Sequence, residues 1–93
     1  MRIAWDPEKD EGNQDKHGVT FAEAQTVFED LEALYIHDPD SADEERWVVI
    51  GMSVRIRLLT VVTWESDDEG IRRIISARRA TQAETRAYAG KFS

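Results

Sequence analysis

Three apolar stretches in the second half of the chain decide the fold: WVVIGM at residues 47–52, RIRLLTVVTW at 55–64 and IRRIISAR at 71–78. They are rich in valine, isoleucine, threonine and tryptophan, which are residue types that favour β-strands. Only short segments separate them, and consecutive strands joined by short turns must be antiparallel. The second half of the chain therefore predicts an antiparallel meander.

The first half adds two strands and a surface helix. Residues 1–5 and residues 33–37 have the composition and alternation of short strands. Asp6 and Pro7 are typical of an N-cap and of a first helical position. We therefore expect a helix that begins at Pro7 and is terminated after His17 by Gly18. The scarcity of apolar residues over residues 8–17 places this helix on the surface.

Capping boxes mark the starts of the two remaining helices. Thr20 with Glu23 marks the start of a helix, and Thr81 with Glu84 opens a C-terminal helix. The first of these helices carries an apolar stripe at helical spacing: Phe21, Ala24, Val27, Phe28 and Leu31. The element order is then strand, two helices, four strands and helix. It predicts an α+β fold: a compact antiparallel β-sheet meander flanked by two N-terminal helices and one C-terminal helix.

Length and composition exclude several classes of protein. The chain has 93 residues, which is room for one domain, residues 1–93. It has no cysteine, which excludes disulfides, thiolate zinc sites and a cysteine nucleophile. No apolar run approaches the roughly 20 residues of a membrane span, and the N-terminus lacks the apolar core of a secretory signal. We therefore expect a cytoplasmic protein.

The net charge of −7 is unevenly distributed along the chain. Residues 1–70 hold 18 acidic and 6 basic side chains, whereas residues 71–93 hold 6 basic side chains and one acid, Glu84. A local basic region can bind phosphate even on an acidic protein, and it can equally bind an acidic partner chain. Composition alone does not choose between these two.

The histidines offer little for a metal site. The sequence has none of the common nucleotide-binding, zinc-hydrolase, serine-hydrolase or calcium-binding motifs. His17 and His37 are twenty residues apart on different expected elements, so we expect no metal and no cofactor. His17 stands at an exposed helix end, where it either interacts with the helix dipole or transfers a proton. We expect His37 to be structural.

Arg73 and Arg78 lie on either side of an apolar strand segment. They are five residues apart, so in a regularly paired strand they need not share a face. A guanidinium suits bidentate phosphate binding and the stabilisation of a developing phosphorane charge. The alternative is that both face solvent and pair with the acids of residues 65–69. The three tryptophans are expected in the core rather than as platforms for base stacking: Trp5, Trp47 and Trp64.

Three segments resemble the BrnT family, and together they cover the chain from Trp5 to Tyr88. They are Trp5-Asp6 with Lys9, Asn13, Lys16-His17-Gly18-Val19, Phe21 and Ala24; Glu45-Arg46 leading into Ile50-Gly51; and Arg73–Ala80 followed by Glu84 and Tyr88. The combination of KHG near the N-terminus with RIISAR near the C-terminus is the specific part of this resemblance. Arg72 stands where the family usually has an apolar strand residue.

The resemblance implies a fold, an activity and a partner. BrnT proteins are toxins of type II toxin–antitoxin modules, with a RelE-like fold, metal-independent RNA cleavage and growth arrest. Their partner is a BrnA antitoxin, whose ribbon-helix-helix part binds operator DNA in a hetero-oligomer. The candidate active-site positions that carry over are Lys16, His17, Arg46, Arg73 and Arg78.

Cleavage of RNA without a metal needs a base, an acid and cationic stabilisation of the charged intermediate. We expect His17, Arg73 and Arg78 to be catalytic, with His17 as acid or base and the arginines as charge stabilisers. We expect Lys16 and Arg46 to bind phosphate, and His17 to converge with the two catalytic arginines on one concave surface. The alternative function is a non-catalytic interaction module that only binds a partner chain through its basic C-terminal face.

Overall fold

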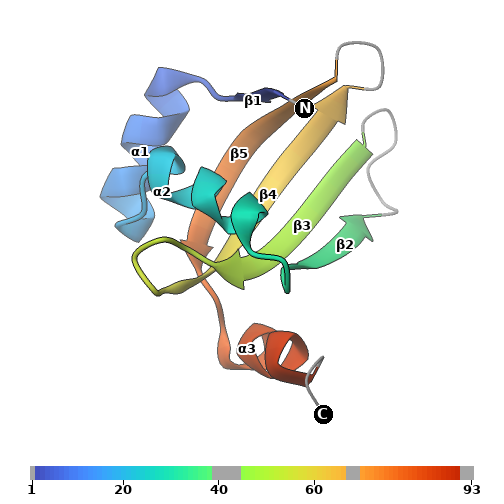
Figure 1. The fold of residues 1–93 in the computed structure, drawn as a ribbon. Coiled ribbons are helices and arrows are strands. Elements are labelled where there is room, and N and C mark those ends of the chain that lie inside the picture. Colours follow the sequence, from blue (N-terminus) through green and yellow to red (C-terminus); the bar gives the residue numbers. More distant parts are fainter. Residues whose placement is uncertain (1, 39–44, 67–69, 91–93) are drawn as a thin grey trace.

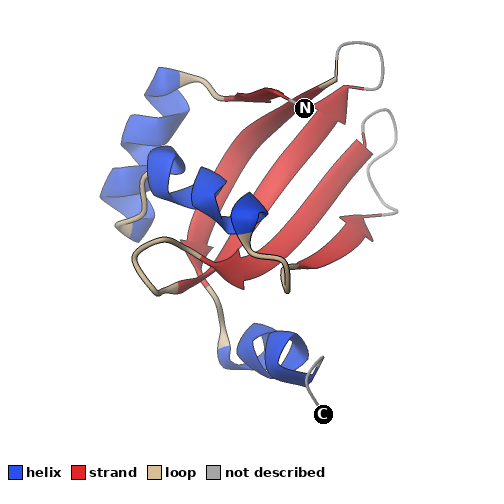
Figure 2. Cartoon of the chain, in the orientation of Figure 1, coloured by secondary structure: helices blue, strands red, loops and turns tan. Residues whose placement is uncertain are grey.

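The predicted antiparallel meander is present as strands β2 (Leu34–Asp38), β3 (Glu45–Met52), β4 (Leu58–Ser66) and β5 (Ile71–Arg79). The computed structural model describes residues 2–38, 45–66 and 70–90. Its other elements are β1 (Arg2–Ala4), α1 (Pro7–His17), α2 (Phe21–Gln25), the short 3-10 helix η1 (Thr26–Glu29) and α3 (Gln82–Ala89). Figures 1 and 2 show α1, α2 and η1 beside and in front of the sheet and α3 near one end of it. The α+β class is confirmed.

The N-terminal strand makes the sheet mixed rather than wholly antiparallel. The strand order is β1-β5-β4-β3-β2, and β1 pairs parallel to β5 with Ile3 opposite Arg72. The short-turn argument applies only to consecutive strands. Most of the chain lies between β1 and β5, and a parallel pair requires such a long connection.

The main hydrophobic core lies between one face of the sheet and the α2–η1 segment. We call this face the covered face. Trp5 and Trp47 pack against the core, as predicted, whereas Trp64 does not belong to it. The fully buried apolar residues of the core are Val19, Phe21, Ala24, Val27, Val49, Leu59, Val61, Ile74 and Ala77.

The first helix begins and ends as predicted. The Asp6 carboxylate accepts a hydrogen bond from the amide of Glu8 at 2.9 Å, and the helix ends at Gly18. Gly18 has φ 68°, a left-handed conformation that favours glycine. Within the described ranges, no helix is both long and apolar enough to cross a membrane.

The second helix is shorter than predicted and is capped differently. Helix α2 gives way to η1, and Leu31 is 97% exposed instead of continuing the apolar stripe. Thr20 caps the amide of Glu23, but Glu23 does not complete the capping box. Its carboxylate instead accepts hydrogen bonds from Arg57 and from the Ser53 hydroxyl, so a tertiary contact replaces the local one.

Strand β4 begins at Leu58, later than the predicted residue 55, because residues 53–57 form the β3–β4 turn. The amide of Ser53 donates to the carbonyl of Arg57, and the amide of Ile56 donates to the carbonyl of Ser53, each at 2.9 Å. Ile56 has φ 60° and is 83% exposed. A β-branched residue is strained in this left-handed conformation.

Two acid-rich segments of the sequence, residues 38–45 and 65–70, lie largely outside the described residues. The described acids at their borders belong to strands: Asp38 ends β2, Glu45 begins β3 and Glu65 lies in β4.

Candidate active site

Arg46, Trp64 and Arg73 lie side by side across three neighbouring strands. In the register of the sheet, Trp64 on β4 is opposite Arg46 on β3 and opposite Arg73 on β5. Residues opposite one another project from the same face, and neighbouring strands are ~4.8 Å apart. The two arginines therefore flank the tryptophan, with Cα atoms about 10 Å apart.

These three residues project from the face opposite to the core. Val61 belongs to the core, and successive side chains of a strand alternate between faces. Trp64 lies three residues beyond Val61, so it points away from the core. We call this side of the sheet the arginine face. Helix α3 contacts β3 and binds Thr60, so it covers one end of this face.

A β-bulge changes the alternation of side chains along β5. The register shifts between Val62 and Thr63, which are opposite Ser76 and Ile74, respectively. Ile75 is therefore an extra residue on β5. A bulge of this kind shifts every later side chain of the strand to the other face.

The bulge places Arg78 on the arginine face together with Arg73. Arg73 is opposite Trp64, and Arg78 is opposite Thr60. Trp64 and Thr60 are four residues apart on β4, so both project from one face, and so do their partners. At about 3.3 Å per residue, the two arginines are roughly 13 Å apart along the sheet. Spacing in the sequence had left this relationship open.

Arg78 is held by an acid that the sequence had not paired with it. Its Nη1 and Nη2 donate to the two carboxylate oxygens of Glu84 at 2.7 and 2.9 Å. Glu84 also accepts from the Thr60 hydroxyl at 2.9 Å and from the Thr81 amide at 2.8 Å, which completes the predicted capping box. The hydrogen bonds from Arg78 are the main reason that the pKa of Glu84 falls to about 2. The same bonds raise the pKa of Arg78.

Asn13 fixes α1 against β5 and so places the His17 turn. Its Nδ2 donates to the carbonyls of Ala77 and Val19, both at 2.8 Å, and its Oδ1 accepts from the amide of Ala77 at 3.1 Å. His17 follows Asn13 by four residues and so lies on the same side of the helix. Figure 1 shows α1 running along β5 in the same direction. His17 is partly buried, and Lys16 is exposed.

The candidate residues thus form two groups. Arg46 and Arg73 flank Trp64 toward one end of the arginine face. His17 lies about 6 Å along α1 from Asn13, and Asn13 contacts Ala77, the residue before Arg78. Arg73 and Arg78 share a face of the sheet, but the convergence of His17 with both of them on one concave surface stays a prediction.

Two side chains of the row formed by Arg46, Trp64 and Arg73 carry a buried hydrogen-bond donor that has no partner among the described residues. In the described part of the chain, the Nε–H of Arg46 and the indole N–H of Trp64 are buried and have no acceptor within the protein. Unpaired buried donors are rare and call for an explanation, such as a bound ligand or water. Trp64, Asn13 and Glu84 were not among the predicted site residues. Asn13 and Glu84 do belong to the segments that resemble BrnT, so that resemblance was the signal that could have identified them as site residues.

Other charged contacts lie away from this face. Arg57 binds Glu23 and donates to the carbonyl of Gly18 at 3.4 Å, and Glu23 has a lowered pKa, mainly because of the hydrogen bonds from Arg57. Arg72 donates to Glu65 at 2.7 Å. The guanidinium of Arg72 also lies over the aromatic rings of Phe28 and Tyr35, at 4.9 and 5.3 Å from their centroids. These contacts keep Arg72 on the covered face.

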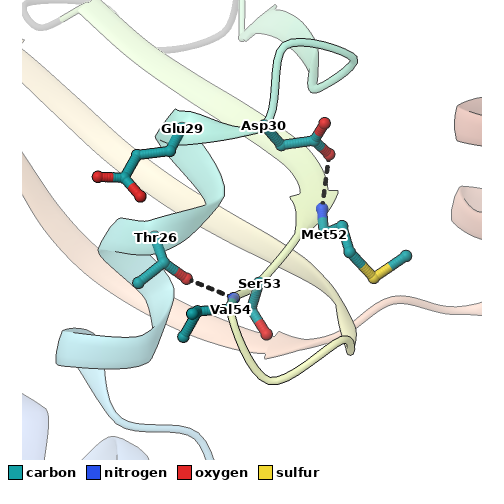
Figure 3. Close-up of a pocket in the computed structure, with 6 residues that line it drawn as sticks. All are labelled: Thr26, Glu29, Asp30, Met52, Ser53 and Val54. Atoms are coloured by element: carbon teal, nitrogen blue, oxygen red, sulfur yellow. Dashed lines mark hydrogen bonds between the residues drawn. The ribbon is translucent and has the colours of Figure 1, made fainter.

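Two hollows in the described surface contain none of the candidate residues. One, of about 290 Å³, lies between η1 and the end of β3, where Asp30 accepts from the Met52 amide and Thr26 accepts from the Val54 amide (Figure 3). The other, of about 480 Å³, lies beside Phe28 and Arg72. His37 is exposed at the sheet edge, with its ring 4.9 Å from that of Trp47. Among the described residues, no three histidine or acidic side chains cluster as metal ligands would.

Comparison with known proteins identifies the family. The family model for BrnT, the ribonuclease toxin of type II toxin–antitoxin systems, matches residues 5–84 of this chain. The crystal structure of the Brucella abortus ribonuclease toxin BrnT is similar, with 28% sequence identity and a TM-score of 0.64. That match covers 88% of this chain and 99% of the other. A comparison with curated protein sequences gives no match.

The fold and the family define a ribonuclease toxin of a toxin–antitoxin system. The chain belongs to the BrnT family.

Proposed function

We propose that this protein cleaves RNA without a metal ion and that a BrnA-like ribbon-helix-helix antitoxin neutralises it. The site of action is the cytoplasm, where RNA and the antitoxin meet. Membership of a family of ribonuclease toxins supports the reaction class. The observation that carries the proposal is the arginine face, where Arg46, Arg73 and Arg78 project from one side of the sheet.

The reaction begins with attack of a ribose 2′-oxygen on the adjacent phosphorus. A base removes the 2′-hydroxyl proton, the bond from phosphorus to the 5′-oxygen breaks, and an acid protonates that leaving oxygen. The products are a 2′,3′-cyclic phosphate and a 5′-hydroxyl. His17 suits the acid or base role because the ordinary pKa of an imidazole lies near neutral pH.

The arginines supply the positive charge that this reaction needs. Arg73 and Arg78 stabilise the charge that develops on the phosphate, and Arg46 together with Lys16 binds the RNA backbone. Glu84 suits neither the acid nor the base role, because a carboxyl with a pKa of about 2 stays ionised and is a weak base at neutral pH. Its role is to orient Arg78.

The antitoxin binds the basic C-terminal region and covers the arginine face. Its operator-binding part remains free in this complex, which is a hetero-oligomer. RNA and the antitoxin bind the same face, so only one of them can be bound at a time. The antitoxin therefore neutralises the toxin by blocking the active site directly.

Purified protein incubated with RNA in the presence of EDTA tests the proposal. We expect cleavage products that end in 2′,3′-cyclic phosphate, and we expect a R73A variant purified in parallel to give none, which controls for contaminating nuclease. Cleavage that stops with EDTA and returns with magnesium or manganese would contradict the metal-independent reaction. Absence of cleavage with retained antitoxin binding would favour the non-catalytic interaction module.

A further inference from the structure

Building on the proposed ribonuclease function, we propose that Trp64 stacks against a base of the bound RNA, between the phosphate-binding side chains of Arg46 and Arg73. The proposal rests on the position of Trp64 in the sheet, on its charged neighbours and on its unpaired indole N–H.

The first observation is the position of Trp64 on the sheet. It is partly exposed, and it lies outside the hydrophobic core that Trp5 and Trp47 pack against. Its neighbours on the arginine face include Val48 and Val62, which are also partly exposed. These side chains form an apolar strip on a sheet surface, and sheet surfaces with aromatic side chains are used for base stacking.

The neighbours of Trp64 on both adjacent strands are cations. Arg46 and Arg73 are its register partners, so positive charge lies on each side of the ring. A single-stranded nucleic acid site combines positive charge along the phosphate backbone with aromatic rings that stack on the bases. The row supplies both parts within about 10 Å.

Two donors in this row have no acceptor among the residues that the structure describes. Arg46 Nε and Trp64 Nε1 are both buried without a partner among the described residues. Leaving a buried donor unpaired is unfavourable, and here the two residues that carry such donors are register partners. Phosphate oxygens and base carbonyls are acceptors that RNA would bring to this position.

Trp47 provides a matched control on the other face of the same sheet. Its indole N–H is also buried and unpaired, but its ring packs against the core and against His37. It lies opposite Thr63 in the register and has no arginine as a register partner. Equivalent substitutions at Trp47 and Trp64 therefore separate the effect of the arginine face from the loss of a tryptophan.

The test is titration with a short single-stranded oligonucleotide whose riboses are 2′-O-methylated, so that it cannot be cleaved by 2′-oxygen attack. We expect the oligonucleotide to quench the tryptophan fluorescence of the wild-type protein and of W47F, but not that of W64F. We expect W64L to bind about tenfold or more weakly than the wild type, because leucine cannot stack, whereas W64F binds within a few-fold. W47L should bind as the wild type does. Thermal melting of each variant shows that it is folded.

Cleavage kinetics add a second readout. We expect W64L to raise KM for RNA about tenfold with a much smaller change in kcat, because Trp64 contacts a base and not the reacting phosphate. Equal affinity of folded W64L and wild type would overturn the stacking proposal while leaving RNA cleavage intact. Loss of quenching in W47F instead of W64F would place the RNA on the other face and overturn it as well. A wild-type protein that neither binds the oligonucleotide nor cleaves RNA would overturn both this inference and the proposed function.

Discussion

Asn13 and Ala77 are joined by two hydrogen bonds across 64 residues of sequence. The amide of Ala77 donates to the side chain of Asn13, and the carbonyl of Ala77 accepts from it. Strand β1 pairs only with residues 71–73 of β5, so the carboxamide of Asn13 occupies the edge of β5 beyond β1. Because the same carboxamide also donates to Val19, it connects the turn after His17 to the strand that carries Arg78.

We expect N13A to lower the free energy of unfolding by about 3 kcal/mol, because it leaves three backbone groups of the interior without a partner. For a domain of this size, that loss corresponds to a decrease in Tm of more than ~10 °C. N13D should be at least as unfavourable, because a carboxylate cannot donate to the two carbonyls. The exposed neighbour Gln14 provides the control: Q14A should melt within a few degrees of the wild type. A N13A variant of unchanged Tm would refute this account.

R73A is expected to abolish toxicity while the fold survives. Removal of a charge stabiliser commonly lowers the rate by roughly 10²–10³. R73K should recover only part of the activity, because lysine lacks the planar pair of donors. Growth after controlled expression, with thermal melting of the purified variants, measures both effects. Full toxicity of a folded R73A would remove Arg73 from the mechanism.

R78A should lose both activity and some stability, because Arg78 binds Glu84 through two hydrogen bonds. The side chain of Arg78 is 38% exposed, so solvent screens the pair, and we expect a loss of about 1–2 kcal/mol. The double variant R78A/E84Q should melt above R78A, because it does not leave an unpaired carboxylate. If the double variant melts no higher than R78A, the assumed cost of that carboxylate is wrong.

The stability of the protein should fall in acid partly through Glu84. Its pKa is about 2 in the folded protein and 4.5 for an ordinary glutamate, so the folded state binds this proton more weakly than the unfolded state. The resulting stabilisation is present above pH ~4.5 and is lost as the pH falls toward ~2, with a size on the order of 2 kcal/mol. The difference in unfolding free energy between the wild type and E84Q should therefore shrink over this range. A difference that stays constant from pH 6 to pH 2 would contradict the assignment.

Replacing Ile56 by glycine or asparagine should stabilise the protein. Ile56 has a left-handed backbone and is 83% exposed, so its side chain contributes little to packing. Relief of the strain is worth about 1 kcal/mol, or an increase in Tm of roughly 4–8 °C. V54G, at the exposed neighbouring position in the same turn, should not raise Tm. An equal gain from both glycine substitutions would mean that the turn conformation is not the cause.

Local chemistry was enough to predict most of the elements. The β-branched stretches, the Asp6 and Thr81 caps and the glycine after His17 each act within a few residues. Strands β3 to β5, α1 and α3 therefore form at the predicted places or within a few residues of them. The core followed from the same periodicity, since Phe21, Ala24 and Val27 are buried as one stripe. These preferences do not depend on what the chain does elsewhere.

Contacts between distant segments decided the rest. Glu23 binds Arg57 instead of completing its capping box, and β1 pairs with β5 in parallel. In both cases the partner comes from a distant part of the chain, and its contact outweighs a weak local preference. One extra residue, Ile75, places Arg73 and Arg78 on a common face, and cross-strand register brings Arg46 beside Trp64. Register depends on the whole sheet, and a shift of one residue reverses every side chain. The face on which these arginines gather is therefore a property of the assembled sheet and could not be derived from the spacing of residues along the chain.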